Sequence, residues 1–262
     1  MAEALFWPAL VAYGEAAIAY AGAARRPGLA GQLGTWGVRV GWLAQTALLA
    51  VQAAASDGFP WTTWAGTLML FVWLVVSAYL FWGCRSRFRL LGLAVMPLTV
   101  VLLVLAYAGG GAAEDGDNAL STAFLTMHVG LVLCGFAGLT LAAALAGLYL
   151  WQERRLKQRR PGVLRLPAPA LVTLEGLSAR TVALSVPALT IGMAVGLVRL
   201  EREGGRFDAL VGLTFVVWVI YAAFLLLRHV GGWRGRRGAY LALAGLAPVL
   251  AITVGLSVSH LS

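Results

Sequence analysis

Long apolar runs separated by short polar segments dominate the chain. Eight of these runs are about 20 residues long, the length that an α-helix needs to cross the hydrocarbon core of a bilayer. They cover residues 3–23, 36–55, 62–83, 89–108, 119–151, 180–199, 210–228 and 238–258. The pattern predicts an all-α integral membrane protein with a single transmembrane domain over residues 1–262, a bundle of about eight transmembrane helices.

The placement of charges orients this bundle. Of the 20 Lys and Arg residues, 17 cluster around the first, third, fifth and seventh connections between runs. Acidic residues concentrate on the opposite side, at Asp57, Glu114, Asp115, Asp117, Glu201, Glu203 and Asp208. Because basic loops stay in the cytoplasm, both termini are expected to be extracytoplasmic. The longest basic loop, about 152–179, is then cytoplasmic and the loop at about 200–209 is outer.

Within the basic loop, the first residues are expected to continue the fifth helix past the membrane. Three prolines then interrupt it, and a short interfacial helix is expected around Leu171–Leu177. On the second run, Gln45 and Gln52 lie one heptad apart and predict hydrogen bonds between helices.

Composition narrows the classes of function. Hydrophobic residues make up 60% of the chain and charged residues 12%, which leaves no room for a sizeable soluble catalytic domain. The net charge of +9 is explained by topology and by contact with anionic membrane lipid, so no nucleic-acid partner is expected. No Lys or Arg precedes Arg25, so the first run is expected to be an uncleaved span rather than a signal peptide. The expected location is the cell inner (cytoplasmic) membrane, crossed many times.

Catalytic signatures are missing from the sequence. There are no paired carboxylates on one face, no nucleophile beside a base, no metalloprotease pattern and no phosphate loop. The two cysteines, Cys84 and Cys134, form no CxxC or CxxCH motif, so covalent heme attachment to this chain is not indicated. An enzyme acting on its own is not expected, and any catalysis would require a partner.

The histidines are the best candidates for chemistry. Counting back about 20 residues from Leu150, the cytoplasmic end of the fifth run, places His128 at the outer membrane face. The last run, read outward from Ala239, places His260 at its outer end. Two imidazoles at one depth on different helices are what a bis-histidine heme site needs. The alternative is two interfacial histidines that share a side by chance.

Four further residues have both a structural and a functional interpretation. His229 follows Arg228 at a cytoplasmic helix end, where a basic side chain is ordinary. Glu15 lies in the middle of the first run, where a proton or ligand role and a plain interhelical hydrogen bond are equally reasonable. Trp61 and Trp64 fit a membrane-interface belt, and they could also line an outer pocket.

Several segments, taken in order, resemble a known family. TMHVGLVLCGFAGLTLAAALAGLYLWQERRLK (126–157) resembles the histidine-bearing helix of the cytochrome c assembly proteins of the CcsA, HemX and CcmC type. LTIGMAVGLVRLEREGGRFD (189–208) resembles the family's next helix and outer loop, and GLSVSHLS (255–262) resembles its end. The resemblance covers about residues 60–262.

The resemblance implies heme handling at the outer face. His128 and His260 match the two histidines that flank the family's outer heme platform, and they would be axial ligands to the iron of heme b. The loop between the sixth and seventh runs, which contains Asp208, matches the platform itself. The tryptophan-rich platform motif of the family is reduced to EGGRFD, and the family's seventh-helix histidine aligns with Leu226. These departures favour the HemX-like branch over the complete synthase subunit.

Three functions follow as hypotheses. The first is heme binding and heme transport during c-type cytochrome biogenesis, with an apocytochrome c or a second cytochrome c assembly membrane protein as partner. The second is a non-catalytic membrane regulator or scaffold, for example of heme biosynthesis, acting through the basic cytoplasmic loops. The third, a small membrane cytochrome that passes electrons to quinone, needs heme on both faces and is disfavoured by a count of three histidines.

Overall fold

The computed structural model describes residues 2–25, 29–55, 63–83, 88–109, 122–158, 169–203, 207 and 209–255. Nine α-helices account for almost all of this described part of the chain. They are α1 (Ala2–Arg25), α2 (Ala30–Ala55), α3 (Trp64–Gly83), α4 (Arg89–Ala108), α5 (Thr122–Lys157), α6 (Leu171–Glu203), α7 (Ala209–His229), α8 (Arg236–Ala244) and α9 (Leu246–Gly255).

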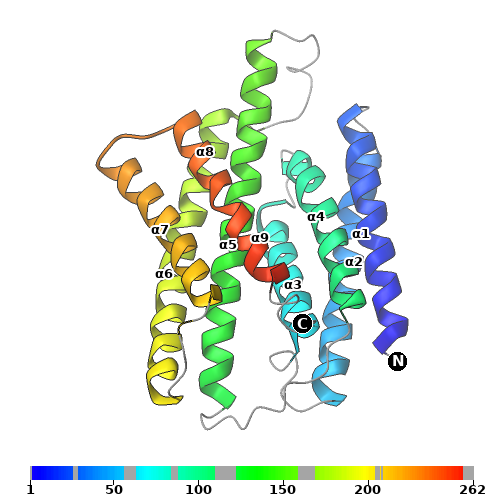
Figure 1. Cartoon of the computed structure of the whole chain (residues 1–262). Helices are drawn as coiled ribbons and strands as arrows, with labels where there is room; N and C mark the ends of the chain where they lie inside the picture. Colours follow the sequence, from blue (N-terminus) through cyan, green and yellow to red (C-terminus); the bar gives the residue numbers. More distant parts are fainter. Residues whose placement is uncertain are drawn as a thin grey trace.

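The helices run alternately up and down in one bundle (Figure 1). Among the described residues, seven helical segments are long and apolar enough to cross a membrane, with α8 and α9 counted together as one segment. The protein is therefore an all-α, multi-pass membrane protein, as the hydrophobic pattern predicts. We call the end of the bundle where α5 begins the histidine end, and the end where α5 finishes at Lys157 the basic end.

The helix α2 is the predicted span that is not among these seven. It has 26 residues, which at about 1.5 Å per residue is enough to cross a bilayer. Its hydropathy is lowered mainly by Arg39 and by Gln32, Gln45 and Gln52, while its glycines are required by its packing. A Cβ on Gly34 would lie 2.8 Å from the Tyr20 ring, and a Cβ on Gly41 would lie 2.7 Å from the Tyr13 ring.

Helix α5 is the centre of the bundle. It packs against α3, α4, α6, α8 and α9, and its contact with α6 is the most extensive in the molecule. At 36 residues it is about 54 Å long, while the hydrocarbon core of a bilayer is about 30 Å thick. The last turns therefore extend past the apolar region with Arg154, Arg155 and Lys157, as expected from the sequence.

Helix α6 differs from the sequence-based expectation. A short interfacial helix around Leu171–Leu177 was expected to precede a separate span at 180–199. Instead, one continuous helix runs from Leu171 to Glu203. The polar residues between the two segments pack against α5 rather than interrupting the helix, since the Ser178 hydroxyl donates to the Ala142 carbonyl at 2.9 Å.

The last predicted span, 238–258, is divided into α8 and α9 at Gly245. Pro248 has no backbone N–H to donate to the preceding turn, which weakens the helix at this point. The ring of Tyr221 on α7 fills the bend, because a Cβ on Gly245 would lie 2.6 Å from its Cζ. The Tyr221 hydroxyl also donates to the Ala242 carbonyl at 2.9 Å.

One buried glutamine joins three helices in the N-terminal half. The Tyr13 hydroxyl of α1 donates to Gln45 Oε1 of α2 at 2.8 Å. Gln45 Nε2 donates to the Met69 carbonyl of α3 at 3.0 Å. The predicted interhelical hydrogen bonding of Gln45 is confirmed.

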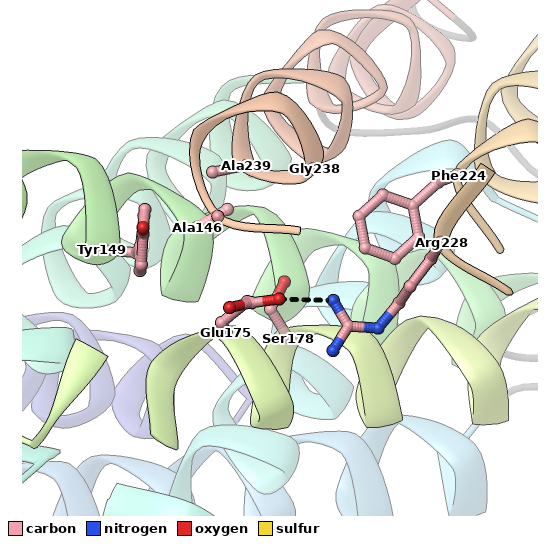
Figure 2. Close-up of a pocket in the computed structure, with 9 residues that line it drawn as sticks. Ala146, Tyr149, Glu175, Ser178, Phe224, Arg228, Gly238 and Ala239 are labelled. Atoms are coloured by element: carbon pink, nitrogen blue, oxygen red, sulfur yellow. Dashed lines mark hydrogen bonds and ion pairs between the residues drawn. The ribbon is translucent and has the colours of Figure 1, made fainter. Parts of the chain in front are cut away.

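The helix α7 is the least buried of the seven spanning segments, and an ion pair anchors it to α6 at the basic end. Arg228 Nη1 lies 2.7 Å from Glu175 Oε1, and each side chain is about one-fifth exposed. Figure 2 shows the pair on the floor of a small pocket where α5, α6, α7 and α8 meet, with Tyr149 and Phe224 on its walls.

We expect Gln45→Leu to destabilise the protein by about 1 kcal/mol, because the Tyr13 hydroxyl is then left buried without its acceptor. Unfolding by denaturing detergent in micelles measures this change. The double variant Tyr13→Phe with Gln45→Leu removes both partners and should recover most of the loss. Additive losses in the double variant would show that the two side chains are not coupled.

We expect Glu175→Gln to loosen α7 at the basic end, because Arg228 loses its countercharge while remaining mostly buried. Hydrogen exchange should become faster in the second half of α7 and stay unchanged in α2. The exchanged pair Glu175→Arg with Arg228→Glu should restore most of the protection. Unchanged exchange in Glu175→Gln would mean that apolar packing alone holds α7 in place.

Candidate heme-ligand site

His128 lies in the second turn of α5, at the histidine end of the bundle. Its side chain is half-buried and points at α6, where Nδ1 lies 2.7 Å from the Gly192 carbonyl oxygen. A carbonyl oxygen can only accept a hydrogen bond, so Nδ1 must carry the hydrogen of this contact. A helical carbonyl has two lone pairs, and it can accept this bond in addition to the one within the helix.

This hydrogen bond decides which nitrogen can act as a ligand. In a neutral imidazole with hydrogen on Nδ1, the lone pair that binds a metal is on Nε2. Histidines that ligate metals characteristically donate from the other ring nitrogen to a carbonyl or carboxylate, which fixes both the tautomer and the ring orientation. His128 is held in this arrangement by the backbone of a neighbouring helix. The donor chemistry therefore fits an axial ligand to heme iron.

Two glycines of α6, one turn apart, face α5 at this point, and Gly196 makes room for the ring. A Cβ on Gly196 would lie 2.8 Å from His128 Nδ1 and 3.2 Å from Nε2, and closer still to Cε1. A Cβ on Gly192 would lie 2.8 Å from Val132 Cγ2 and 3.1 Å from the Val132 backbone nitrogen. The two glycines let α6 approach α5 closely enough for a backbone carbonyl to reach the imidazole.

The close approach continues along the whole α5–α6 contact. A Cβ on Gly135 would lie 3.1 Å from the Leu189 Cβ, and a Cβ on Gly138 would collide with the Ser185 hydroxyl. Small residues at helix contacts are the common device for close packing inside membranes, where no hydrophobic effect drives helices together. The position of the His128 ring thus depends on a long rigid contact.

The structure describes only some of the other predicted site residues. His260, Asp208 and Trp61 lie outside the described residues. Met127 and Gly130 lie close to the histidine on α5, and a Cβ on Gly130 would meet no atom of the described residues within 4 Å. None of the described helices therefore fills the α5 surface at Gly130.

Trp64 lies at the histidine end and links three helices there. Its indole Nε1 donates to the Thr253 carbonyl of α9 at 3.1 Å, and its ring packs against Gly109 at the end of α4. In this structure the indole holds the end of α9 in place. The helix α9 ends at Gly255, five positions before His260 in the sequence.

His229 and Glu15 are both remote from His128. His229 is the last residue of α7 and is exposed at the basic end. Glu15 is exposed on α1, which packs mainly on α2 and α4. The described residues contain no group of three or more His, Cys, Asp and Glu side chains that could hold a metal ion.

The pocket at the basic end is not a second ligand site of this kind. Its polar lining is an ion pair whose charges satisfy each other, with the Ser178 hydroxyl already donating to Ala142 (Figure 2). The space within it suits about one water molecule. No histidine or cysteine is among the residues that line it.

The sequence indicates His128 as a candidate ligand but not the α6 residues that contact it. The segment GMAVG (192–196) has the small-xxx-small spacing that is typical of close helix contacts in membranes. That spacing could have indicated a close approach to another helix. It could not have indicated that His128 is the residue on the other side.

The comparisons with known proteins agree with the resemblance noted in the sequence. The family model described as "Cytochrome C assembly protein" matches residues 61–261. The chain is 26% identical over 236 residues to the "Cytochrome c biogenesis protein CcsA" of Guillardia theta, with coverage of 81% of this chain and 78% of the relative. It is 27% identical over 278 residues to the protein of the same name from Gloeothece citriformis, with coverage of 86% and 84%.

A further relative carries a different name. The chain is 29% identical over 194 residues to "Protein HemX" of Brevibacillus brevis, with coverage of 72% of this chain and 71% of the relative. No solved structure matches the chain. Because the family model covers more than three-quarters of the chain, from the start of α3 to the C-terminal segment, this chain belongs to the cytochrome c assembly protein family.

Proposed function

We propose that this multi-pass membrane protein of cytochrome c assembly binds b-type heme near the outer face of the inner membrane. His128 and His260 would be the two axial ligands, and Asp208 would lie in the neighbouring loop. The observation that carries the proposal is the hydrogen bond from His128 Nδ1 to the Gly192 carbonyl. This bond keeps the hydrogen on Nδ1, leaves the lone pair on Nε2 and fixes the orientation of the ring, as an axial ligand needs.

The proposed position of the second ligand, His260, depends on the last membrane span, which α8 and α9 form. The bend at Gly245 and the hydrogen bond between Trp64 and Thr253 direct α9 towards the histidine end. His260 is only five positions after Gly255 in the sequence, and even a fully extended chain spans at most about 18 Å over five such steps. These contacts support an arrangement in which His260 approaches the end of the bundle that carries His128.

The chemistry of the pair suits a carrier. His128 and His260 would together hold the heme iron through two imidazoles, and heme held in this way would be retained without activating oxygen. The role of His128 is to present Nε2 in a fixed direction, and the role of α6 is to hold the imidazole ring. The protein would hand heme on to an apocytochrome c or to a second assembly protein in the membrane.

A regulator or scaffold is the second candidate, and the basic end favours it. Here α5 extends beyond the apolar region, and Glu153 binds Lys157 at 2.7 Å and Arg236 at 3.5 Å. The pair with Lys157 lies within α5, and the pair with Arg236 connects α5 to α8. Arg154, Arg234 and Arg237 are exposed at the same end, where a soluble or membrane partner could contact them. The similarity to Protein HemX is compatible with a role that differs from that of the CcsA relatives.

We expect purified protein supplied with heme to show a low-spin Soret band and sharp visible bands in the reduced state. His128→Ala and His260→Ala should each abolish this spectrum, because one imidazole leaves the iron five-coordinate or unbound. Visible absorption of wild type and variants in the same detergent measures the effect. A heme-supplied wild type without the low-spin spectrum contradicts heme ligation and leaves the regulator as the better candidate.

His229→Ala is the matched control, and we expect it to keep the full low-spin spectrum. His229 is exposed at the basic end, on a different helix from His128. Loss of heme from this variant would place the iron at the wrong end of the bundle and would refute the assignment of His128 and His260.

A further inference from the structure

We infer that Gly192 and Gly196 of α6 are positioning residues for the His128 ligand: the Gly192 carbonyl selects the imidazole tautomer, and Gly196 supplies the space in which the ring lies. The inference rests on the proposed function for its relevance to heme, but its first part concerns the protein without any bound group. Neither residue would touch the iron. Both would act through His128.

The Gly192 carbonyl determines the tautomer because of its geometry. The distance of 2.7 Å between His128 Nδ1 and the Gly192 oxygen is that of a strong hydrogen bond. The bond requires hydrogen on Nδ1, and the site is half-buried, so losing it would leave a polar group without compensation. A backbone carbonyl in the middle of a helix also cannot rotate away, in contrast to a carboxylate on a flexible side chain.

Gly196 determines the position of the ring because no side chain fits there. A methyl group at this residue would overlap Cε1 and approach Nδ1 to 2.8 Å and Nε2 to 3.2 Å. These distances are well inside van der Waals contact, so the imidazole must move. A ring displaced from α6 loses its bond to Gly192 and with it the fixed direction of Nε2. Metal affinity typically falls by about 10- to 100-fold when such a supporting contact is removed.

The chain offers two matched glycine-to-alanine controls, one on each helix of the pair. Gly176→Ala adds the same methyl to α6 at a position where no atom of the described residues lies within 4 Å. Gly135→Ala adds it to α5 against Leu189 at 3.1 Å, which disturbs the packing of the two helices without touching a histidine. Gly176→Ala controls for the composition of the helix, and Gly135→Ala controls for a general disturbance of the contact.

The first test needs no heme. Nitrogen NMR of protein labelled at histidine distinguishes the two tautomers, and the signal of His128 is identified by its absence from His128→Asn. We expect hydrogen on Nδ1 in wild type, Gly176→Ala and Gly135→Ala, and a change towards the Nε2-protonated form in Gly196→Ala. Hydrogen on Nε2 of His128 in the wild type overturns the inference, whatever the protein does with heme.

The second test measures retention of heme. We expect Gly196→Ala to retain heme at least about tenfold less tightly than wild type, and both controls to stay within about twofold. Equal losses in Gly196→Ala and Gly135→Ala would overturn the role of Gly196, since packing alone would then explain them. A wild type that binds no heme refutes the proposed function instead, and the tautomer test still decides the inference.

A third test covers the case in which Gly196→Ala does not fold. His128→Gly opens a space that free imidazole can enter. Imidazole can donate to the Gly192 carbonyl and bind iron with its other nitrogen, whereas 1-methylimidazole can bind iron but has no N–H to donate. We expect imidazole to restore the low-spin spectrum at a concentration at least about tenfold lower than 1-methylimidazole. Equal restoration by the two compounds overturns the role of the Gly192 carbonyl.

Discussion

The close contact between α5 and α6 is the constraint on which the rest of the structure depends. Inside a membrane, lipid chains are as apolar as leucine, so helices associate only where they fit closely or share hydrogen bonds. The glycines at 135, 138, 192 and 196 supply the fit, and the hydrogen bond from Ser178 to Ala142 adds polar contact. Because the contact extends over most of both helices, it sets the register between them to within a fraction of a turn.

That register has different consequences at the two ends of the bundle. At the histidine end it brings the Gly192 carbonyl to the edge of the His128 imidazole, which fixes the orientation of the ring. At the basic end it places Glu175 beside Arg228 of α7. The helix α7 is otherwise little buried, and the ion pair secures it where apolar packing contributes least.

Polar side chains elsewhere in the bundle form hydrogen bonds between or within helices rather than ligand-binding sites. Trp42 Nε1 donates to the Ser77 hydroxyl and Trp73 Nε1 donates to the Thr46 hydroxyl, both at 2.8 Å between α2 and α3. Several Ser and Thr hydroxyls in the described helices also donate to the carbonyl one turn before them, as with Thr140 and Thr181. In a medium without water these bonds satisfy groups that would otherwise be buried at a cost. This is why the numerous polar residues within the spans do not by themselves indicate function.

The sequence by itself determined that the chain is a helical membrane protein and where most of its spans lie, and it indicated His128 and His260 as candidate ligands. These properties depend on local hydrophobic pattern and on the distribution of charge, which a single chain displays directly. It also indicated that Gln45 would join helices. The continuous helix α6, the bend at Gly245 and the pairing of Glu175 with Arg228 were decided only by the tertiary structure. So was the meeting of His128 with Gly192 and Gly196, because each of these depends on which faces of distant helices come together, and helix order and rotation are not encoded in any local pattern.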